Sequence, residues 1–408
     1  MKIVISSIGS RGDIQPIVAL ATTLQSSGHV VTLCVPPNFK PFVETHGIAC
    51  VPVGPDVQKW TASLGAQPGA KQPSKEQIRK MAMAGLKGVV QDQFKVLRET
   101  AQGCDLIVVA GGVQSAGSSI AELYAIPYVY ATYCPVTLPS PAHPPPMIRN
   151  QNLPGLVNRL LWIASGYSWN KIYRAAVNTE RKVLGLPPVP DIPSMVTTAH
   201  PLVAADAALA PAAPSSRLQF TQTGAWLLPD STPLPDELER FLAAGEAPVY
   251  IGFGSMRANP QANALLIQVA RACGRRVIVS KGWGNLDLVD AGTDCIAIGE
   301  VAHAQLFPRV AAVVHHGGAG TTTAAALAGV PQVIVPHLYD QFYWAHRIQQ
   351  LGIGVGGPKV GKLTAPVMKK VLARCLSADC RLAAATFAPR VERHGVQRAA
   401  ELLVKKIA

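Results

Sequence analysis

The side chains best suited to binding and catalysis gather in residues 315–341 of this 408-residue chain, HHGGAGTTTAAALAGVPQVIVPHLYDQ. An apolar run over 310–314 ends at two histidines, and Gly317, Gly318 and Gly320 then lead into a Thr/Ala-rich stretch that is typical of a helix. Glycine allows a ligand to approach the backbone closely. The N-terminus of a helix presents unpaired N–H groups and the positive end of the helix dipole, which favour phosphate. We therefore expect a phosphate-binding turn here.

A carboxylate and an amide follow one loop later. Asp340 and Gln341 come after a second apolar run, 333–335, which favours a buried strand. Their side chains can bind hydroxyl groups, or they can simply cap the loop. A phosphate-binding turn beside hydroxyl-binding side chains indicates a sugar nucleotide as the ligand. The chain contains neither a Walker pattern nor an Asp-x-Asp motif, so no metal-dependent phosphate site is expected.

A second polar motif, GSRGDIQP, follows the apolar run at 3–8 and precedes a helix that we expect to start near 14–18. It lacks the G-x-G-x-x-G pattern of dinucleotide-binding folds. Asp13 suits two compatible roles, as a cap of the helix N-terminus or as a general base that takes a proton from a hydroxyl. A carboxylate is a weak base towards an alcohol, so the second role requires that Asp13 be held close and partly desolvated.

Both motifs resemble those of family 1 glycosyltransferases (the UDP-glycosyltransferase superfamily) of the GT-B fold, in the branch that includes antibiotic glycosyltransferases and sterol 3-β-glucosyltransferases. The resemblance is strongest over 1–35 and 249–355 and weakest over 60–200, the part that shapes acceptor choice. It implies that Asp13 is the catalytic base. It also implies that His316, protonated or donating an N–H, stabilises the departing diphosphate in place of a metal ion.

The resemblance also implies contacts for the rest of the site. The diphosphate and sugar would be held by Ser255 of the GFGSM loop and by His316, Gly318, Gly320, Thr321, Asp340 and Gln341. Trp283 in SKGWG would stack on the nucleotide base, although a tryptophan that caps a sheet fits the same position. The backbone at Val301 would also contact the base. Ser10 and Gly12 would lie on the loop that meets donor or acceptor, whereas Arg11 receives no role.

Short runs rich in valine and isoleucine alternate with helix-like segments in both halves of the chain. They lie at 3–8, 30–35, 106–109 and 128–130, and then at 249–251, 276–280, 296–298, 312–314 and 333–335. Buried strands that alternate with helices predict parallel sheets, and two such series predict an α/β protein with two Rossmann-like domains facing across a cleft.

The Pro, Ser and Thr content suggests where these domains divide. We expect an N-terminal acceptor-binding domain over 1–215, a linker over 216–235 and a C-terminal nucleotide-sugar-binding domain over 236–389. By the same resemblance, a C-terminal helix over 390–408 would pack back on the N-terminal domain.

The composition narrows the remaining choices. The net charge is +13, but basic residues are spread over both halves and no nucleic-acid-binding motif is present. Eight scattered cysteines without a C-x-x-C pair argue against structural zinc and favour a reducing cytoplasm. No apolar run reaches the roughly 18 residues of a membrane span. Residues 71–90 mix basic and apolar side chains, which is typical of a solvated amphipathic helix or of one touching an acceptor or a membrane surface.

Together these features predict an inverting, metal-independent hexosyltransferase with no cofactor beyond its nucleotide-sugar co-substrate. We expect UDP-glucose as donor and a hydrophobic hydroxyl-bearing acceptor, such as a sterol, lipid or natural product, because the Pro-rich region 135–165 is apolar. The first alternative is a dTDP-deoxysugar-dependent transferase acting on an antibiotic or macrolide. Two others are a GT-B nucleotide-sugar epimerase and a non-catalytic sugar-nucleotide-binding partner, although Asp13, His316 and Asp340 argue against both. The oligomeric state is not indicated.

Overall fold

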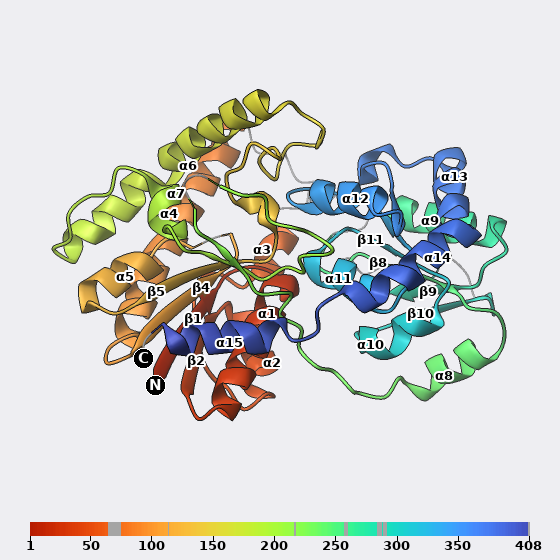
Figure 1. Ribbon diagram of the computed structural model, residues 1–408, viewed down its shortest axis with the longest axis horizontal. Coiled ribbons are helices and arrows are strands. Elements are labelled where there is room, and N and C mark those ends of the chain that lie inside the picture. The colour runs from red at the N-terminus through yellow and green to blue at the C-terminus, as the bar shows by residue number, and fades with distance from the viewer. Residues whose placement is uncertain are drawn as a thin grey trace.

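The computed structural model describes residues 1–63, 75–112, 114–215, 218–256, 260–283, 288 and 292–406, without the side chains of 61–63, 75–83 and 260. Over these ranges the chain forms two α/β units, each built on a parallel sheet (Figure 1). The prediction of two Rossmann-like domains is therefore confirmed.

The N-terminal sheet has, over the described ranges, seven parallel strands in the order β3-β2-β1-β4-β5-β6-β7. Its strands are β1 (Lys2–Ser7), β2 (Val30–Val35), β3 (Ala49–Pro52), β4 (Leu106–Ala110), β5 (Tyr128–Thr132), β6 (Leu202–Val203) and β7 (Thr221–Gln222). All of β1 after Lys2 is buried, as expected for a central parallel strand with helices on both faces. Strand β7 lies inside the segment 216–235 that we predicted as a linker, so the N-terminal sheet extends to Gln222.

The C-terminal sheet has six parallel strands within the described part of the chain, in the order β10-β9-β8-β11-β12-β13. Its strands are β8 (Val249–Gly252), β9 (Val277–Ser280), β10 (Cys295–Ile298), β11 (Ala312–His315), β12 (Gln332–Ile334) and β13 (Gly354–Gly356). The GFGSM and HHGGAG motifs follow β8 and β11, which are neighbours in the sheet. Both motifs therefore lie at one edge, where the strands present their carboxyl ends.

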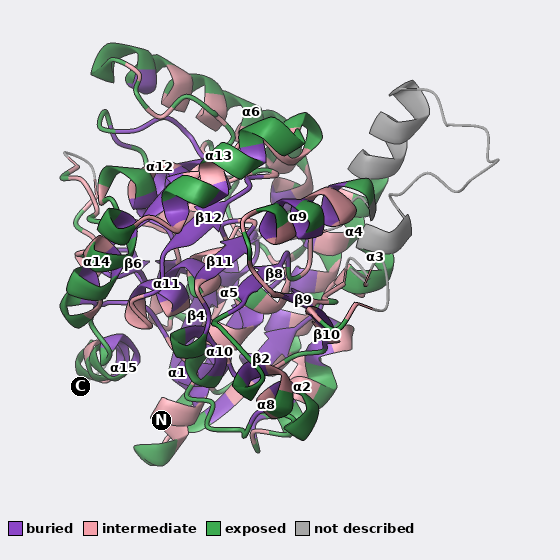
Figure 2. Cartoon of the chain, turned by 90° about the vertical axis from the view of Figure 1, so that its right-hand side faces the viewer, coloured by how far each residue is buried: buried purple, intermediate pink, exposed green. Residues whose placement is uncertain are grey.

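Helices cover both sheets. In the N-terminal half they are α1 (Arg11–Ser26), α2 (Lys40–Glu44), α3 (Val57–Ser63), α4 (Lys75–Thr100), α5 (Gly117–Tyr124), α6 (Gly155–Val183) and α7 (Ile192–Thr197). In the C-terminal half they are α8 (Asp236–Ala243), α9 (Pro260–Ala272), α10 (His303–Leu306), α11 (Ala319–Leu327), α12 (Gln341–Gln350), α13 (Ala365–Cys375), α14 (Ala378–Phe387) and α15 (Gly395–Lys405). Figure 2 shows buried residues along the strands and exposed residues on the outer faces of the helices.

The last helix returns to the N-terminal half of the molecule (Figure 1). Helix α15 packs on α1 and buries Val396, Ala399 and Leu403 in the same apolar cluster as β1. Gly395 begins this helix, and a Cβ there would lie 2.5 Å from the carbonyl oxygen of Ala225. The close approach of these two segments therefore requires glycine.

Helix α12 also joins the two halves. Tyr343 and Trp344 lie in one apolar cluster with Val136 and Leu138 of the N-terminal half. The ring of Tyr343 meets the ring of His143 edge-on, with centroids 6.3 Å apart. The two carboxyl edges are thereby brought face to face.

In the described part of the chain, no helix is both long and apolar enough to cross a membrane. Residues 71–74 of the predicted amphipathic segment 71–90 lie outside the described residues, as do the side chains of 75–83.

Candidate active site between the two domains

Asp13 lies in the first turn of α1, directly after β1 and its glycine loop. Its Oδ2 accepts hydrogen bonds from the backbone N–H of Ser10 (2.8 Å) and from the Ser10 hydroxyl (3.3 Å). A Cβ on Gly9 would lie 2.1 Å from the same oxygen, so the turn requires glycine there. Burial raises the pKa of Asp13 from 3.8 to about 6, against the lowering effect of the Ser10 hydrogen bonds. Asp13 thus caps its helix and is also a desolvated carboxylate of raised basicity.

The other carboxylate oxygen of Asp13 faces the loop after β4. A Cβ on Gly111 would lie 3.2 Å from Oδ1, and Gly111 has a φ of +85°, which favours glycine. The hydroxyl of Tyr133 donates to the main-chain oxygen of Asp13 over 2.8 Å. Within the described residues Oδ1 accepts no hydrogen bond, so it is the oxygen placed to receive a proton. Gly111 and Tyr133 were not predicted from the sequence.

The His316 ring is enclosed by glycines. A Cβ on Gly318 would lie 2.7 Å from His316 Nε2, and one on Gly254 of the GFGSM loop would lie 3.4 Å from Cε1. Gly317 has a φ of +96°, and a Cβ on it would lie 2.6 Å from Ile334. Burial lowers the pKa of His316 from 6.5 to about 3. The neutral imidazole is therefore the favoured form of His316, and it corresponds to the N–H donor of the two predicted forms.

The helix that follows presents its N-terminus to the same space. The N–H of Thr322 donates to the carbonyl of Gly318 over 3.0 Å, so the amides before it point out of the first turn. Gly320 is exposed and Thr321 is half-buried in this turn. Ser255 is half-buried on the neighbouring GFGSM loop. Inside the described ranges, His316 Nδ1 is buried without a hydrogen-bond partner. This arrangement can accept an anion.

Trp283 lies on the loop after β9. Its ring stacks on Phe39 of the N-terminal half, with centroids 5.9 Å apart. The backbone N–H of Trp283 donates to the carbonyl of Gly254 over 2.9 Å, and Gly282 packs against that same carbonyl. Val301 is half-buried and packs on the C-terminal core before α10. A nucleotide base that stacked on this face of the Trp283 ring would displace Phe39 or insert between the two rings.

Asp340 and Gln341 lie at the start of α12 and make different contacts. Trp344 Nε1 donates to Asp340 Oδ2 over 2.9 Å. Gln341 Oε1 accepts from the N–H groups of His337 (2.7 Å) and Leu338 (3.0 Å), so this amide caps its own loop. The Gln341 oxygen therefore caps its loop, whereas no hydrogen bond to Asp340 Oδ1 is found within the described residues.

The two carboxylates face each other across the domains. Burial, with a smaller contribution from the negative charge of Asp13, raises the pKa of Asp340 from 3.8 to about 7. Tyr339 reaches into the same space with a φ of +59°, which is rare for a bulky residue. Its hydroxyl lies 3.4 Å from the position of a Cβ on Gly112. Strained residues of this kind concentrate at functional sites, and no sequence pattern indicated this one.

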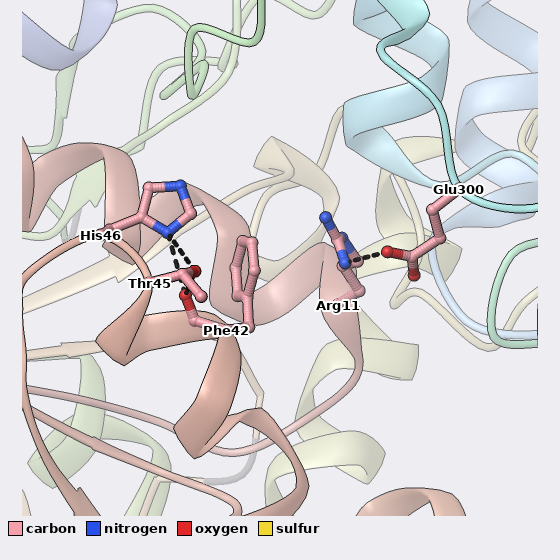
Figure 3. Close-up of polar contacts among 5 residues, drawn as sticks. All are labelled: Arg11, Phe42, Thr45, His46 and Glu300. Atoms are coloured by element: carbon pink, nitrogen blue, oxygen red, sulfur yellow. Dashed lines mark hydrogen bonds and ion pairs between the residues drawn. The ribbon is translucent and has the colours of Figure 1, made fainter. Parts of the chain in front are cut away.

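An ion pair joins the two halves of the molecule beside the Asp13 loop. Figure 3 shows Arg11 lying between Phe42 and Glu300, with its guanidinium paired to the Glu300 carboxylate. The guanidinium is 4.3 Å from the centre of the Phe42 ring. Arg11 precedes Asp13 on the same turn and Glu300 precedes Val301, so this contact joins the predicted base-binding loop to the loop of the catalytic carboxylate. Ser10 and Gly12 lie on that loop, half-buried and exposed respectively.

Two protein families match the chain. Residues 3–141 match the glycosyltransferase family 28 N-terminal domain, and residues 266–391 match the C-terminal domain of erythromycin biosynthesis protein CIII-like proteins. The chain is 40% identical over 413 residues to a vancomycin aglycone glucosyltransferase of Amycolatopsis orientalis, covering 100% of this chain and 98% of the relative. It is 38% identical to a dTDP-epi-vancosaminyltransferase of the same organism, covering 87% and 85%.

The solved structures agree on the fold. The glycosyltransferase of kitacinnamycin superposes with a TM-score of 0.73 at 19% identity, covering 100% of this chain and 99% of that one.

These relatives correct the predicted branch. The prediction of a sterol or lipid glucosyltransferase using UDP-glucose is wrong, because relatives over nearly the full length are named for antibiotic aglycones and a dTDP-linked sugar. That prediction rested on the apolar, Pro-rich region 135–165, and an apolar segment does not distinguish a sterol from the apolar body of an antibiotic aglycone.

Because the match extends over the whole chain, the chain belongs to the GT-B family 1 glycosyltransferases of the EryCIII-like antibiotic glycosyltransferase type.

Proposed function

We propose that the protein transfers a sugar from a dTDP-sugar to a hydroxyl group of an antibiotic-type aglycone, with inversion at the anomeric carbon and without a metal ion. The names of the relatives support this donor and acceptor class. The observation that carries the mechanism is the pairing of Asp13 and Asp340 across the cleft, beside His316 and the N-terminus of α11. A base, a sugar-binding carboxylate and an anion site then surround one space.

Asp13 supplies the base. Its Oδ2 is held by Ser10, so Oδ1 receives the proton of the acceptor hydroxyl as that oxygen forms a bond to the anomeric carbon. A pKa of about 6 leaves the carboxylate ionised at neutral pH and makes it a stronger base than an exposed aspartate. General-base assistance of this kind contributes about 10²–10⁴-fold in rate.

The leaving group is stabilised by the C-terminal domain. As the bond between the anomeric carbon and the diphosphate oxygen breaks, negative charge grows on the diphosphate. His316 and the first-turn amides of α11 are donors aimed at that charge, and Ser255 adds a hydroxyl. The same charge raises the pKa of the His316 imidazole when the donor binds, because an anion nearby favours the charged ring. No metal ion is required for this step.

Asp340 is placed to hold the sugar. Trp344 fixes one carboxylate oxygen, which leaves the other for sugar hydroxyls. Gln341 would have to release its loop, or use its N–H groups, to take part. Its amide nitrogen donates to the Met256 sulfur over 3.6 Å.

The test is product detection by mass spectrometry. The enzyme is incubated with dTDP-glucose or UDP-glucose and a panel of antibiotic aglycones, with EDTA, and Asp13→Asn is the matched control because asparagine can still accept from Ser10. We expect a hexose adduct from the dTDP-sugar that survives EDTA and falls at least about 100-fold in the variant, while dTDP binding by calorimetry is kept.

Other outcomes contradict the proposal. Equal transfer by Asp13→Asn would remove the base from the mechanism. Conversion of the sugar nucleotide without any acceptor would favour an epimerase. Binding of dTDP-sugar with no transfer to any aglycone would favour a non-catalytic partner.

A further inference from the structure

A cavity of about 250 Å³ lies between the two halves of the molecule, next to the candidate active site. One wall is the outer face of α12 with the glycines at the end of β13, and the other is the loop over 149–152 of the N-terminal half. The volume far exceeds the roughly 10–15 Å³ that a single water needs. A group of several heavy atoms therefore fits.

The position of the cavity follows from the strand order. Loops after β9 and β10 carry Trp283 and Val301, the loop after β11 carries His316, and the loop after β12 carries Asp340. The cavity comes next along this edge, at the ends of β12 and β13, where Pro336 lines it. A donor that runs from base to diphosphate to sugar along these loops would end before it. The cavity is therefore reached from the acceptor end of the cleft.

The walls are polar and carry no negative charge. Of the described residues that line the cavity, none is an aspartate or a glutamate, and several are side-chain amides. The chain has no acidic residue at all between Glu122 and Glu180. Arg149 lies near the middle of this acid-free stretch, and the structure gives it no carboxylate partner among the described residues. Its guanidinium instead lies over the ring of Phe342, 6.0 Å from the centroid. Aromatic contact of this kind holds the cation in place while its N–H groups stay free.

A second side chain in the cavity wall, Gln151, can also accept a hydrogen bond from a ligand. Gln151 Nε2 donates to the carbonyl of Ile148 over 2.7 Å, which fixes the orientation of the amide. Its Oε1 is buried and has no hydrogen-bond partner within the described ranges. Buried polar atoms of proteins are rarely left without one. On the opposite wall, Gln349 Oε1 accepts from the N–H of Gly356 over 3.3 Å, so its amide hydrogens remain available.

We propose that this cavity is an acceptor subsite that binds a carboxylate, and the N–H or hydroxyl next to it, at a part of the aglycone remote from the glycosylated hydroxyl. Arg149 binds the carboxylate through paired N–H groups, for which a guanidinium has the matching geometry. Gln151 Oε1 accepts from the neighbouring N–H or hydroxyl, and Gln349 donates from the far wall. The assignment rests on the proposed function, since it presumes an aglycone as the second substrate.

The test compares carboxylate-bearing aglycones with their methyl esters. Binding of each acid and ester is measured by calorimetry without donor, on the wild-type protein and on Arg149→Ala, Arg149→Lys and Arg159→Ala. Arg159 is exposed on α6 and does not line the cavity, so it controls for the general loss of a positive charge. Because binding is measured without turnover, the result does not depend on the transfer reaction.

We expect the wild-type protein to bind at least one acid about 10- to 100-fold more tightly than its ester, as for a hydrogen bond to a charged group. Arg149→Ala should remove this difference and leave ester binding and dTDP binding unchanged. Arg149→Lys should restore part of it, and Arg159→Ala should keep all of it. Equal binding of every acid and its ester by the wild type would overturn the proposal, whether or not transfer is found. An Arg149→Ala variant that weakens acid and ester alike would also overturn it, by showing a structural role.

Discussion

Replacing Asp340 by asparagine tests whether a second carboxylate is buried opposite Asp13. Asparagine keeps the shape of the side chain and an oxygen that can accept from Trp344 Nε1, now 2.9 Å from Oδ2. It removes only the charge. Burial raises the pKa of Asp340 from 3.8 to about 7, and the Asp13 charge contributes to this rise. The variant should therefore relieve an unfavourable buried charge.

The sign of the pH dependence follows from the raised pKa. The folded protein holds this proton more tightly than the unfolded chain, so its stabilising effect is complete below about pH 4 and is lost as the pH rises through about 7. One unit of pKa difference corresponds to about 1.36 kcal/mol. The rise from 3.8 to about 7 thus corresponds to a contribution of about 4 kcal/mol at most to the free energy of unfolding. About 3 kcal/mol of this contribution persists at pH 5 and almost none at pH 8.5. Asp340 is half-buried, so solvent screening reduces these figures.

Asp340→Asn should therefore be more stable than the wild type by about 2–4 kcal/mol at pH 8.5 and by about 1 kcal/mol at pH 5. Denaturant unfolding followed by tryptophan fluorescence at both pH values measures this difference. Asp236→Asn, at an exposed carboxylate in the first turn of α8, is the control and should show no such pH dependence. Asp340→Asn should also lose sugar transfer.

An advantage of equal size at pH 5 and pH 8.5 would refute the reasoning, because it would show that the charge at Asp340 is not the cause. A double-mutant cycle with Asp13→Asn sharpens the test. If the two carboxylates repel each other, the combined stabilisation at pH 8.5 should be smaller than the sum of the single effects. Strict additivity would contradict their placement across one cleft.

Three further predictions concern neighbouring residues. Gly318→Ala should lower kcat/KM for the donor about tenfold or more, because its Cβ would lie 2.7 Å from His316 Nε2, whereas Gly361→Ala in the turn Val360–Lys362, whose Cβ would meet nothing within 4 Å, should have little effect in the same assay. Tyr339→Phe should leave the thermal unfolding temperature unchanged but lower kcat by about 5- to 10-fold, as one lost hydrogen bond would; unchanged kcat would exclude a role for the hydroxyl. Arg11→Ala should weaken dTDP binding by less than about fivefold, because exposed ion pairs contribute about 1 kcal/mol or less, and the effect should vanish at high salt.

The strands that could be predicted from the sequence are the central ones. Strands β1, β4, β8 and β11 each contain at least three consecutive apolar residues buried on both faces, and such runs are visible without a structure. Strands β7 and β13 are only two and three residues long and have no recognisable pattern. They become strands because β6 and β12 each leave an edge that a passing segment can pair with. Propensity cannot reveal such a strand, since tertiary context creates it.

The same distinction applies within the site. Asp13 and His316 sit in local motifs, where a strand, a glycine turn and a helix N-terminus are consecutive, so their position and chemistry could be predicted together. Tyr133 meets Asp13 across 120 residues of sequence, and only the parallel pairing of β1, β4 and β5 brings them together. Tyr339 adopts an unusual backbone conformation that no propensity favours. Residues that long-range contacts bring into the site could therefore not be predicted from the sequence.

The mistaken acceptor has a structural cause that also indicates where acceptor choice is encoded. In the proposed mechanism, the loops that carry the recognisable motifs bind the diphosphate, the sugar and the proton of the nucleophile, whichever acceptor is used. Under the two proposals above, the acceptor would meet the Pro-rich segment before α6 and the cavity lined by Arg149. This surface has both an apolar face and a cationic end. An apolar segment alone suggested a sterol, but a sterol has no anionic group for Arg149 to bind. An aglycone with an apolar body and a distant carboxylate would use both.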